Sequence, residues 1–314
     1  MAVAIRPMTE SDLPFARQIC HKAFGTFLGA PDPQNFFADR DYVYGRFGSE
    51  HVAAFTAELD GEVVGSNFAT RWGSVGFFGP VSVRPDLWNR GFAQPLVRAA
   101  SDAFEAWGIS HAGLFTFPHS TKHLHLYGKF RFYPRFLTAI MSAPAKPAAD
   151  PGRWSRYSEL SEGDRGTAEN LCRGVSDALF PGLDLGAEIR TVAARGLGDT
   201  LLLSDGASGL ASFAVCHWGP ASEAGEGCCF VKFGAVRSEK GAESRFGRLL
   251  AAGRALAASI GMPNLLAGVN LAREESYRHM AASGFRTEFQ GVAMHRPNDW
   301  GYSRPGVFVI DDWR

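Results

Sequence analysis

The chain has 314 residues, of which 46% are hydrophobic and 20% are charged, and this composition is typical of folded globular protein. At about 150 residues per domain, the length accommodates two domains, each with its own core. Lysine plus arginine number 32 and aspartate plus glutamate also number 32, so the formal net charge is zero. Proteins that bind nucleic acids or acidic membranes usually carry a basic excess, and the charge balance therefore disfavours both partners.

The sequence also indicates a cytoplasmic location. The N-terminus lacks a long apolar segment, and no stretch approaches the ~18 consecutive apolar residues that cross a bilayer. The cysteines are scattered, and no CxxC pair is present to hold zinc. We therefore expect a cytoplasmic protein with reduced thiols and no metal. The cysteines are Cys20, Cys172, Cys216, Cys228 and Cys229.

In the first half, the hydrophobic pattern predicts strands and helices in alternation. The clearest local signal is the Asp60-Gly61 pair between two β-rich runs, because this pair favours a two-residue hairpin turn. The predicted strands lie over 2–6, 51–59, 62–70, 76–83, 111–117 and 136–141. The predicted helices lie over 12–25, 34–47 (the weakest), 95–107 and 122–129.

A segment rich in proline and alanine over 142–152 is predicted to be a linker. After it, a similar order of elements returns, including a second hairpin around Asp205-Gly206. The predicted strands are 154–160, 201–204, 209–218, 229–236, 265–270 and 287–295, and the predicted helices are 161–179, 244–260 and 274–282. We therefore expect an α+β (mixed α/β) fold of two related domains, each a mixed, mostly antiparallel sheet flanked by helices. The expected boundaries are 1–143, a linker over 144–152, and 153–314 with an aromatic C-terminal tail that packs on a domain.

The segment Val81–Leu96 carries the most informative motif. A strand runs through a loop with the sequence Arg90-Gly91-Phe92-Ala93 into a helix. The free N–H groups and the positive dipole of a helix N-terminus bind anions, most often phosphates. Gly91 and Ala93 are small where a backbone must approach its ligand, and Arg90 adds a positive charge. The alternative is an ordinary strand-to-helix turn without a ligand.

This segment resembles motif A of the GNAT superfamily of acetyl-CoA-dependent N-acetyltransferases, whose pattern is [Gln/Arg]-x-x-Gly-x-[Gly/Ala]. Gly91 and Ala93 match its last two fixed positions, and Trp88 departs from the first. The resemblance implies that loop amides bind the pyrophosphate of acetyl-CoA and that the main chain of the preceding strand contacts its pantetheine arm and thioester carbonyl. The cofactor-binding residues that it implies are Val81, Val83, Trp88, Asn89, Arg90, Gly91, Phe92, Ala93, Gln94 and Ser120.

A second segment, Leu126–Phe132, resembles the end of motif B of the same family, Leu-Tyr-x-Lys-x-Gly-Phe, with Arg131 in place of the glycine. The resemblance implies that Tyr127 is the catalytic general acid that protonates the leaving thiolate, and a phenol is suited to this task. Packing on the sheet is the alternative role of Tyr127. The family's Asn is replaced by Ser120, which can still hydrogen-bond the pantetheine arm. The family fold also implies a gap for the coenzyme between Val81–Val83 and Leu114–Phe117.

No general base stands out. Glu58, His111 and His119 are candidates, and an ordinary solvated role is the alternative for each. His119, His123 and His125 cluster, but no cysteine or well-spaced carboxylate nearby completes a metal site.

The second half matches the family less well. Its equivalent loop contains Gly241, but Glu239 and Glu243 would repel phosphates. Met280 stands where the family has its tyrosine. We therefore expect the second half to be a degenerate GNAT-like domain.

Taken together, the motifs predict an enzyme. The resemblance implies an acetyl-CoA-dependent N-acetyltransferase that moves the acetyl group by direct transfer to a primary amine of a small molecule or peptide. The alternatives are a non-catalytic acyl-CoA-binding regulatory module and a two-domain scaffold. A homodimer is compatible with the sequence, which does not identify the acceptor.

Overall fold

The computed structural model describes residues 3–147, 154–206 and 209–314. Its helices are α1 (Leu13–Phe27), α2 (Ala93–Ala106), α3 (Thr121–Gly128), α4 (Glu162–Asp177), α5 (Gly186–Ala194), α6 (Ala242–Ser259) and α7 (Glu274–Ala282). The strands of the first half are β1 (Ala4–Pro7), β2 (Val52–Leu59), β3 (Glu62–Trp72), β4 (Val75–Phe78), β5 (Ser82–Val83), β6 (His111–Thr116) and β7 (Tyr133–Pro144). Those of the second half are β8 (Trp154–Arg156), β9 (Gly198–Ser204), β10 (Leu210–Gly219), β11 (Gly225–Val236), β12 (Asn264–Asn270), β13 (Arg286–Arg296) and β14 (Val309–Asp311).

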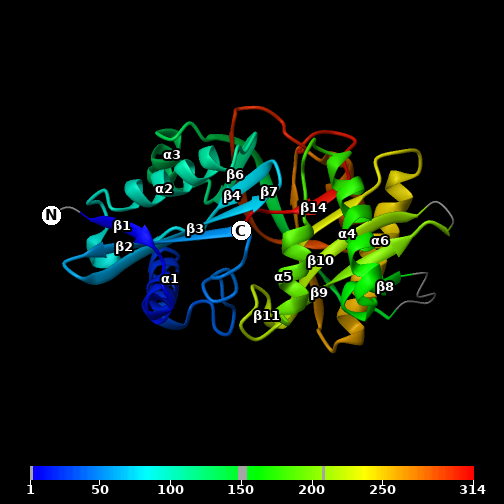
Figure 1. The fold of residues 1–314 in the computed structure, drawn as a ribbon, viewed down its shortest axis with the longest axis horizontal. Coiled ribbons are helices and arrows are strands. Elements are labelled where there is room, and N and C mark those ends of the chain that lie inside the picture. The colour runs from blue at the N-terminus through cyan, green and yellow to red at the C-terminus, as the bar shows by residue number, and fades with distance from the viewer. Residues whose placement is uncertain (1–2, 148–153, 207–208) are drawn as a thin grey trace.

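The expected mixed α/β fold is confirmed, but the two halves do not keep separate sheets. The described residues form a 14-stranded sheet whose main path runs β1-β2-β3-β4-β6-β13-β7-β12-β11-β10-β9-β8. We call residues 3–144 the N half and residues 154–314 the C half. Strand β13 of the C half pairs with β6 of the N half, and strand β7 of the N half pairs with β12 of the C half. The two halves lie side by side along the long axis of the molecule and share these two strands at its centre (Figure 1).

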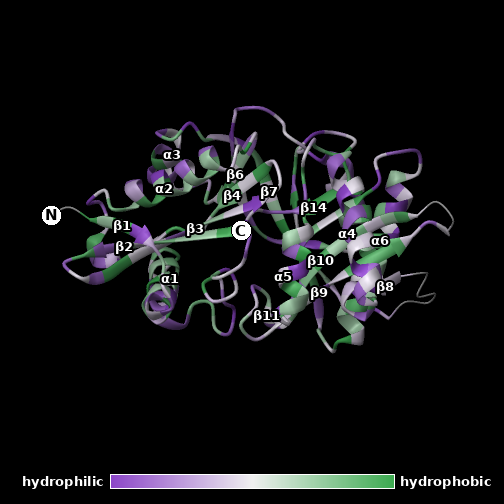
Figure 2. Cartoon of the chain, viewed as in Figure 1, coloured by the Kyte–Doolittle hydropathy of each residue, from purple (hydrophilic) through white to green (hydrophobic). Residues whose placement is uncertain are grey.

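Local chemistry explains the best-predicted elements. In the turn between β2 and β3, Asp60 and Gly61 both adopt left-handed backbone angles, with φ of 52° and 84°, as a tight hairpin of this type requires. Helix α4 begins at the predicted cap, because the Ser161 hydroxyl accepts a hydrogen bond from the Asp164 amide. The helices carry hydrophilic residues on one side, whereas much of the sheet is hydrophobic (Figure 2). The second hairpin forms between β9 and β10; its residues 207–208 lie outside the described part.

Two expectations were wrong, and one helix was missed. Residues 34–47 form only a short 3-10 turn (Pro33–Asn35) and irregular turns, because Phe37 packs against both Phe36 and Phe24 instead of joining a regular helical face. The strand expected over 76–83 is divided into β4 and β5 by Gly79-Pro80, which lacks a proline N–H for the sheet. Helix α5 was not predicted.

The segment expected to be a linker is partly strand, since β7 runs to Pro144. Residues 148–153 of it lie outside the described part. No helix of the described residues is long and apolar enough to cross a membrane.

Candidate acyl-transfer site

A large pocket opens in the N half where two parallel strands diverge. Strands β4 and β6 pair from Val75 and His111 as far as Phe77 and Gly113 and then separate. The pocket has a volume of about 810 Å³, and Val81, Val83 and Leu114–Phe117 line it. It therefore lies where the sequence analysis expected the gap for a coenzyme.

The loop before α2 forms one end of the pocket. Asn89 and Gly91 both have left-handed backbone angles, with φ of 64° and 86°, and these angles bend the loop into the start of the helix. A Cβ atom built on Gly91 would meet only the Gln94 side chain, 3.8 Å away, so the space before this loop is open. Asn89, Gly91, Phe92, Ala93 and Gln94 all line the pocket. A turn of this kind at a helix N-terminus fits a pyrophosphate.

Trp88 stands where the motif A pattern has Gln or Arg, and its indole packs beside the loop before α2. Its Nε1–H donates to the Val83 carbonyl oxygen over 2.8 Å, so this oxygen already has a partner. The Lys122 ammonium lies 4.8 Å from the centre of the indole ring. Lys122 lines the pocket and makes no ion pair among the described residues, so it places an unpaired cation beside the loop before α2.

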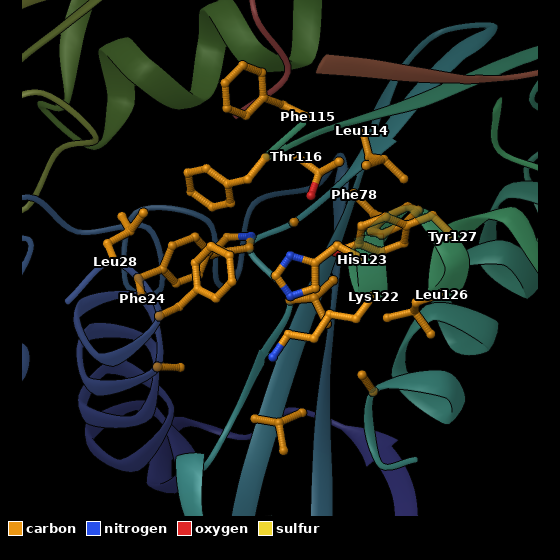
Figure 3. A pocket seen from close by; sticks show the side chains of 18 of the residues that line it. Phe24, Leu28, Phe78, Leu114, Phe115, Thr116, Lys122, His123, Leu126 and Tyr127 are labelled. Atoms are coloured by element: carbon orange, nitrogen blue, oxygen red, sulfur yellow. The ribbon is translucent and has the colours of Figure 1, made fainter. Parts of the chain in front are cut away.

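Tyr127 lies on α3 and faces the pocket opposite α1 (Figure 3). Its ring packs against Phe78 at a centroid distance of 5.7 Å. Burial raises the pKa of the phenol well above its usual range, and a hydrogen bond with Thr116 offsets part of the rise. The phenol therefore stays protonated at neutral pH and can donate a proton.

Two of the predicted cofactor-binding residues do not line the pocket. The Arg90 side chain is exposed to solvent. Ser120 is buried at the start of α3, and its hydroxyl has no hydrogen-bond partner. The other predicted residues line the pocket, and these are Val81, Val83, Trp88, Asn89, Gly91, Phe92, Ala93, Gln94 and Tyr127.

Of the three base candidates, only His119 lines the pocket. Glu58 forms an ion pair with Arg6, and the buried His111 contacts His295. His123 also lines the pocket; burial, assisted by the nearby Lys122, lowers its pKa to about 4 and keeps its ring neutral at pH 7. No group of three His, Cys, Asp or Glu side chains in the described chain is arranged to hold a metal ion.

The wall opposite Tyr127 was not predicted from the sequence. It consists of α1, the irregular segment 36–42 and residues from the far end of the chain. Phe24 and Phe27 are three residues apart, and this spacing could have indicated that both lie on one face of a helix. No pattern in the sequence indicates that this face lines a pocket together with Phe289 and Trp313. The aromatic residues of this wall are Phe24, Phe27, Phe36, Phe37, Tyr42, Phe289 and Trp313, and Phe115 and Phe117 at the end of β6 also line the pocket.

In the C half, the corresponding gap is filled by the chain itself. Strands β11 and β12 pair in parallel at residues 229–231 and 265–267. Beyond this point β14 pairs with β11 instead, and a Cβ atom on Gly268 of β12 would lie 2.4 Å from Asp312. The tail therefore occupies the position at which the N half has its pocket. Met280, the counterpart of Tyr127, is fully buried in the core of the C half.

After filling this gap, the tail reaches the pocket of the N half. Trp313 packs on Gly113 of β6, where a Cβ atom would lie 2.0 Å from the indole ring. Arg314 also lines the pocket, and its backbone oxygen accepts a hydrogen bond from Arg46. Arg46 additionally donates to the Gly79 carbonyl and pairs with Glu223 over 2.8 Å. Residues from both halves therefore build this single pocket.

A buried network of charges holds the two halves together behind the pocket. Glu223 binds both Arg46 and Lys232, and Glu188 accepts from His51 over 3.0 Å. Burial favours the protonated form of Glu223, but the charges of Arg46, Lys232 and His217 prevail and lower its pKa to about 2. Glu223 is therefore ionised at neutral pH. Sequence analysis missed the network because its charged residues have the ordinary pattern of a solvated surface.

Comparison with known proteins agrees with this geometry. Residues 17–132 match the model of the acetyltransferase (GNAT) family. A putative acetyltransferase from Pyrococcus horikoshii is similar in structure, with a TM-score of 0.67, 13% identity, and coverage of 95% of this chain and 90% of that one. A GCN5-related N-acetyltransferase from Sphaerobacter thermophilus is also similar in structure, with a TM-score of 0.58 and 14% identity. The match covers 94% of this chain and 95% of that one.

A third solved structure also matches along nearly the whole chain. It is a tandem GNAT protein from the clavulanic acid biosynthesis pathway, with a TM-score of 0.56, 13% identity, and coverage of 95% of this chain and 100% of that one. At these identities the likeness shows the fold alone. A comparison with curated proteins found no match. The fold and the family model together support an acyltransferase.

Proposed function

We propose that this chain, whose residues 17–132 form a domain of the GNAT acetyltransferase family, transfers an acetyl group from acetyl-CoA directly to a primary amine. One observation carries the proposal: the helix N-terminus at Gly91, the diverging strands and the Tyr127 phenol all face the same pocket. The amide groups of residues 89–94 would hold the pyrophosphate. One site per chain is expected, because β14 fills the equivalent gap in the C half.

The chemistry balances without a further reactant. The amine nitrogen forms a bond with the thioester carbonyl carbon, the carbon–sulfur bond breaks, and the thiolate takes a proton to become free coenzyme A. Tyr127 supplies this proton, because its buried phenol is neutral at physiological pH. The amine must lose a proton, and His119 is the base candidate that lines the pocket.

The test is an assay of coenzyme A thiol release with acetyl-CoA and a panel of primary amines, together with calorimetric binding of acetyl-CoA. Tyr127→Phe should abolish most turnover and retain binding. Tyr133→Phe is the matched control, because Tyr133 is 44% exposed and does not line the pocket. Binding of acetyl-CoA without turnover of any amine would favour a non-catalytic acyl-CoA-binding module. Absence of binding would contradict both functions and leave a scaffold.

A further inference from the structure

The acceptor end of the pocket differs chemically from its coenzyme end. Phe24 on α1 and Leu28, which directly follows α1, face His123 and Tyr127 on α3 across the pocket (Figure 3). Behind Phe24 the aromatic side chains form a continuous cluster: ring centroids are 5.3 Å apart for Phe24 and Phe37 and 5.1 Å apart for Phe37 and Tyr42. We call Phe24, Phe36, Phe37, Tyr42 and Phe117 the aromatic wall. An apolar or aromatic group is the ligand that such a wall accommodates.

The charge of the lining disfavours a second positive charge on the acceptor. None of the described residues that line the pocket is Asp or Glu, whereas Arg40, Lys122, Lys129 and Arg314 all line it. Aromatic faces can bind cations, but Tyr42 of the aromatic wall and the neighbouring Phe27 on α1 each already face a protein cation. Arg46 lies 5.5 Å from the centre of the Tyr42 ring, and Lys122 lies 5.6 Å from that of Phe27. A second ammonium group would therefore lose its hydration without gaining a partner.

In the described part of the chain, Arg40 supplies an unpaired positive charge next to the aromatic wall. Lys122 lies over the Trp88 ring beside the loop before α2, and Lys129 follows the last residue of α3. Arg314 is paired with Asp312 over 3.0 Å. Arg40 is half-buried, lines the pocket next to the aromatic wall, and makes neither an ion pair nor a side-chain hydrogen bond among the described residues. Its neighbour Asp39 instead accepts from the Glu226 amide. An unpaired guanidinium at an apolar wall is suited to bind a carboxylate.

We propose that the acceptor is a small primary amine that carries an aromatic ring and a carboxylate, with the ring on the aromatic wall and the carboxylate on Arg40. This inference rests on the proposed acetyl transfer. The same apolar surroundings help the reaction, because they disfavour the ammonium form and so release the neutral amine that attacks the thioester. The products are the N-acetylated amine and free coenzyme A.

The experiment measures kcat/KM for four amines at saturating acetyl-CoA. L-phenylalanine has both features, phenethylamine lacks the carboxylate, alanine lacks the ring, and cadaverine carries a second ammonium. We expect phenylalanine to be the best substrate and cadaverine the poorest. Arg40→Gln should lower kcat/KM for phenylalanine about tenfold or more and leave that for phenethylamine unchanged. Arg278→Gln is the control, because Arg278 is 68% exposed on α7 and, in the part of the chain that the structure describes, forms its ion pair with Glu274 alone.

Calorimetric binding of N-acetylphenylalanine to the protein with coenzyme A gives a readout that does not depend on turnover. Arg40→Gln should weaken this binding, and Arg278→Gln should not. Preference for cadaverine, an equal loss for phenylalanine and phenethylamine, or no turnover of any of the four amines by a protein that binds acetyl-CoA would each overturn the inference. Failure to bind acetyl-CoA would instead overturn the proposed function.

Discussion

Substitution of Glu223 tests whether the charge network behind the pocket joins the two halves. Glu223 lies in the connection between β10 and β11 of the C half, and its partner Arg46 lies 177 residues earlier in the chain. Both side chains are at most 3% exposed, and Lys232, also bonded to Glu223, is nearly as buried. Glu223→Gln removes the negative charge and leaves two buried cations with Glu188 alone. Breaking a buried pair in this way costs about 3–5 kcal/mol, because the remaining charge has lost both water and partner.

The expected shift in melting temperature follows from the size of the chain. An unfolding entropy of about 2.1 cal/mol/K per residue gives about 0.66 kcal/mol/K for 314 residues, so this loss corresponds to about 4–8 °C. Scanning calorimetry at pH 7 measures it, with Glu226→Gln as the control, because Glu226 is exposed three residues away. Melting temperatures of the two variants within about 1 °C of each other would refute the reasoning.

The pH dependence gives a second check on the same residue. The folded-state pKa of Glu223 is about 2, below the usual value of 4.5. A lowered carboxyl pKa contributes stability above the unfolded value, and this contribution disappears as the pH falls from about 4.5 towards 2. The difference in melting temperature between the wild type and Glu223→Gln should therefore be largest at pH 7 and should shrink below pH 4.

Three further predictions concern the pocket and the tail. Tyr127→Phe should lower kcat about 10²–10⁴-fold and leave acetyl-CoA affinity within about twofold, as measured by thiol release and calorimetry; equal loss of both would contradict the acid role. Burial raises the pKa of the Tyr127 phenol, so the activity of the wild type should not fall through deprotonation of this group up to pH 10. A fall in activity below pH 10 that is absent in Tyr127→Phe would refute this expectation. Gly113→Ala should destabilise the protein by about 1–3 kcal/mol in chemical denaturation, because the new methyl group displaces Trp313; the control Gly227→Ala, with open space around its Cα, should not.

The sequence predicts most elements of this fold but not which strands become neighbours. The β2–β3 hairpin and α7 could be predicted because their signals are local, as in the turn at Asp60-Gly61 and the helix stop at Gly284. The pairing of β7 with β12 and of β13 with β6 could not be predicted, because an apolar strand pattern is equally compatible with either neighbour. Helix α5 was missed because it is short and buries a charged residue, Glu188, whose partners come from distant segments.

The same division applies to the site. Motif residues such as Gly91 and Tyr127 could be placed because their spacing repeats in a known family, and most of them line the pocket. The wall opposite Tyr127 could not be predicted, because it combines α1 and the irregular segment 36–42 with Phe289 and the tail. The tail can occupy the gap of the C half because Gly268 has no side chain where Asp312 packs against β12. This contact depends on the assembled sheet and has no local signal in the sequence.

The most direct test of the account is a calorimetric titration of the protein with acetyl-CoA, alongside Gly91→Asp and Gly241→Asp. The two glycines precede α2 and α6, and both have left-handed backbone angles, with φ of 86° and 91°, so the variants carry a similar backbone strain. We predict one binding site per chain, at least a tenfold loss of affinity in Gly91→Asp, where a carboxylate would meet the pyrophosphate, and no loss in Gly241→Asp. Two sites per chain, or loss of binding in Gly241→Asp alone, would contradict the placement of the coenzyme in the N half.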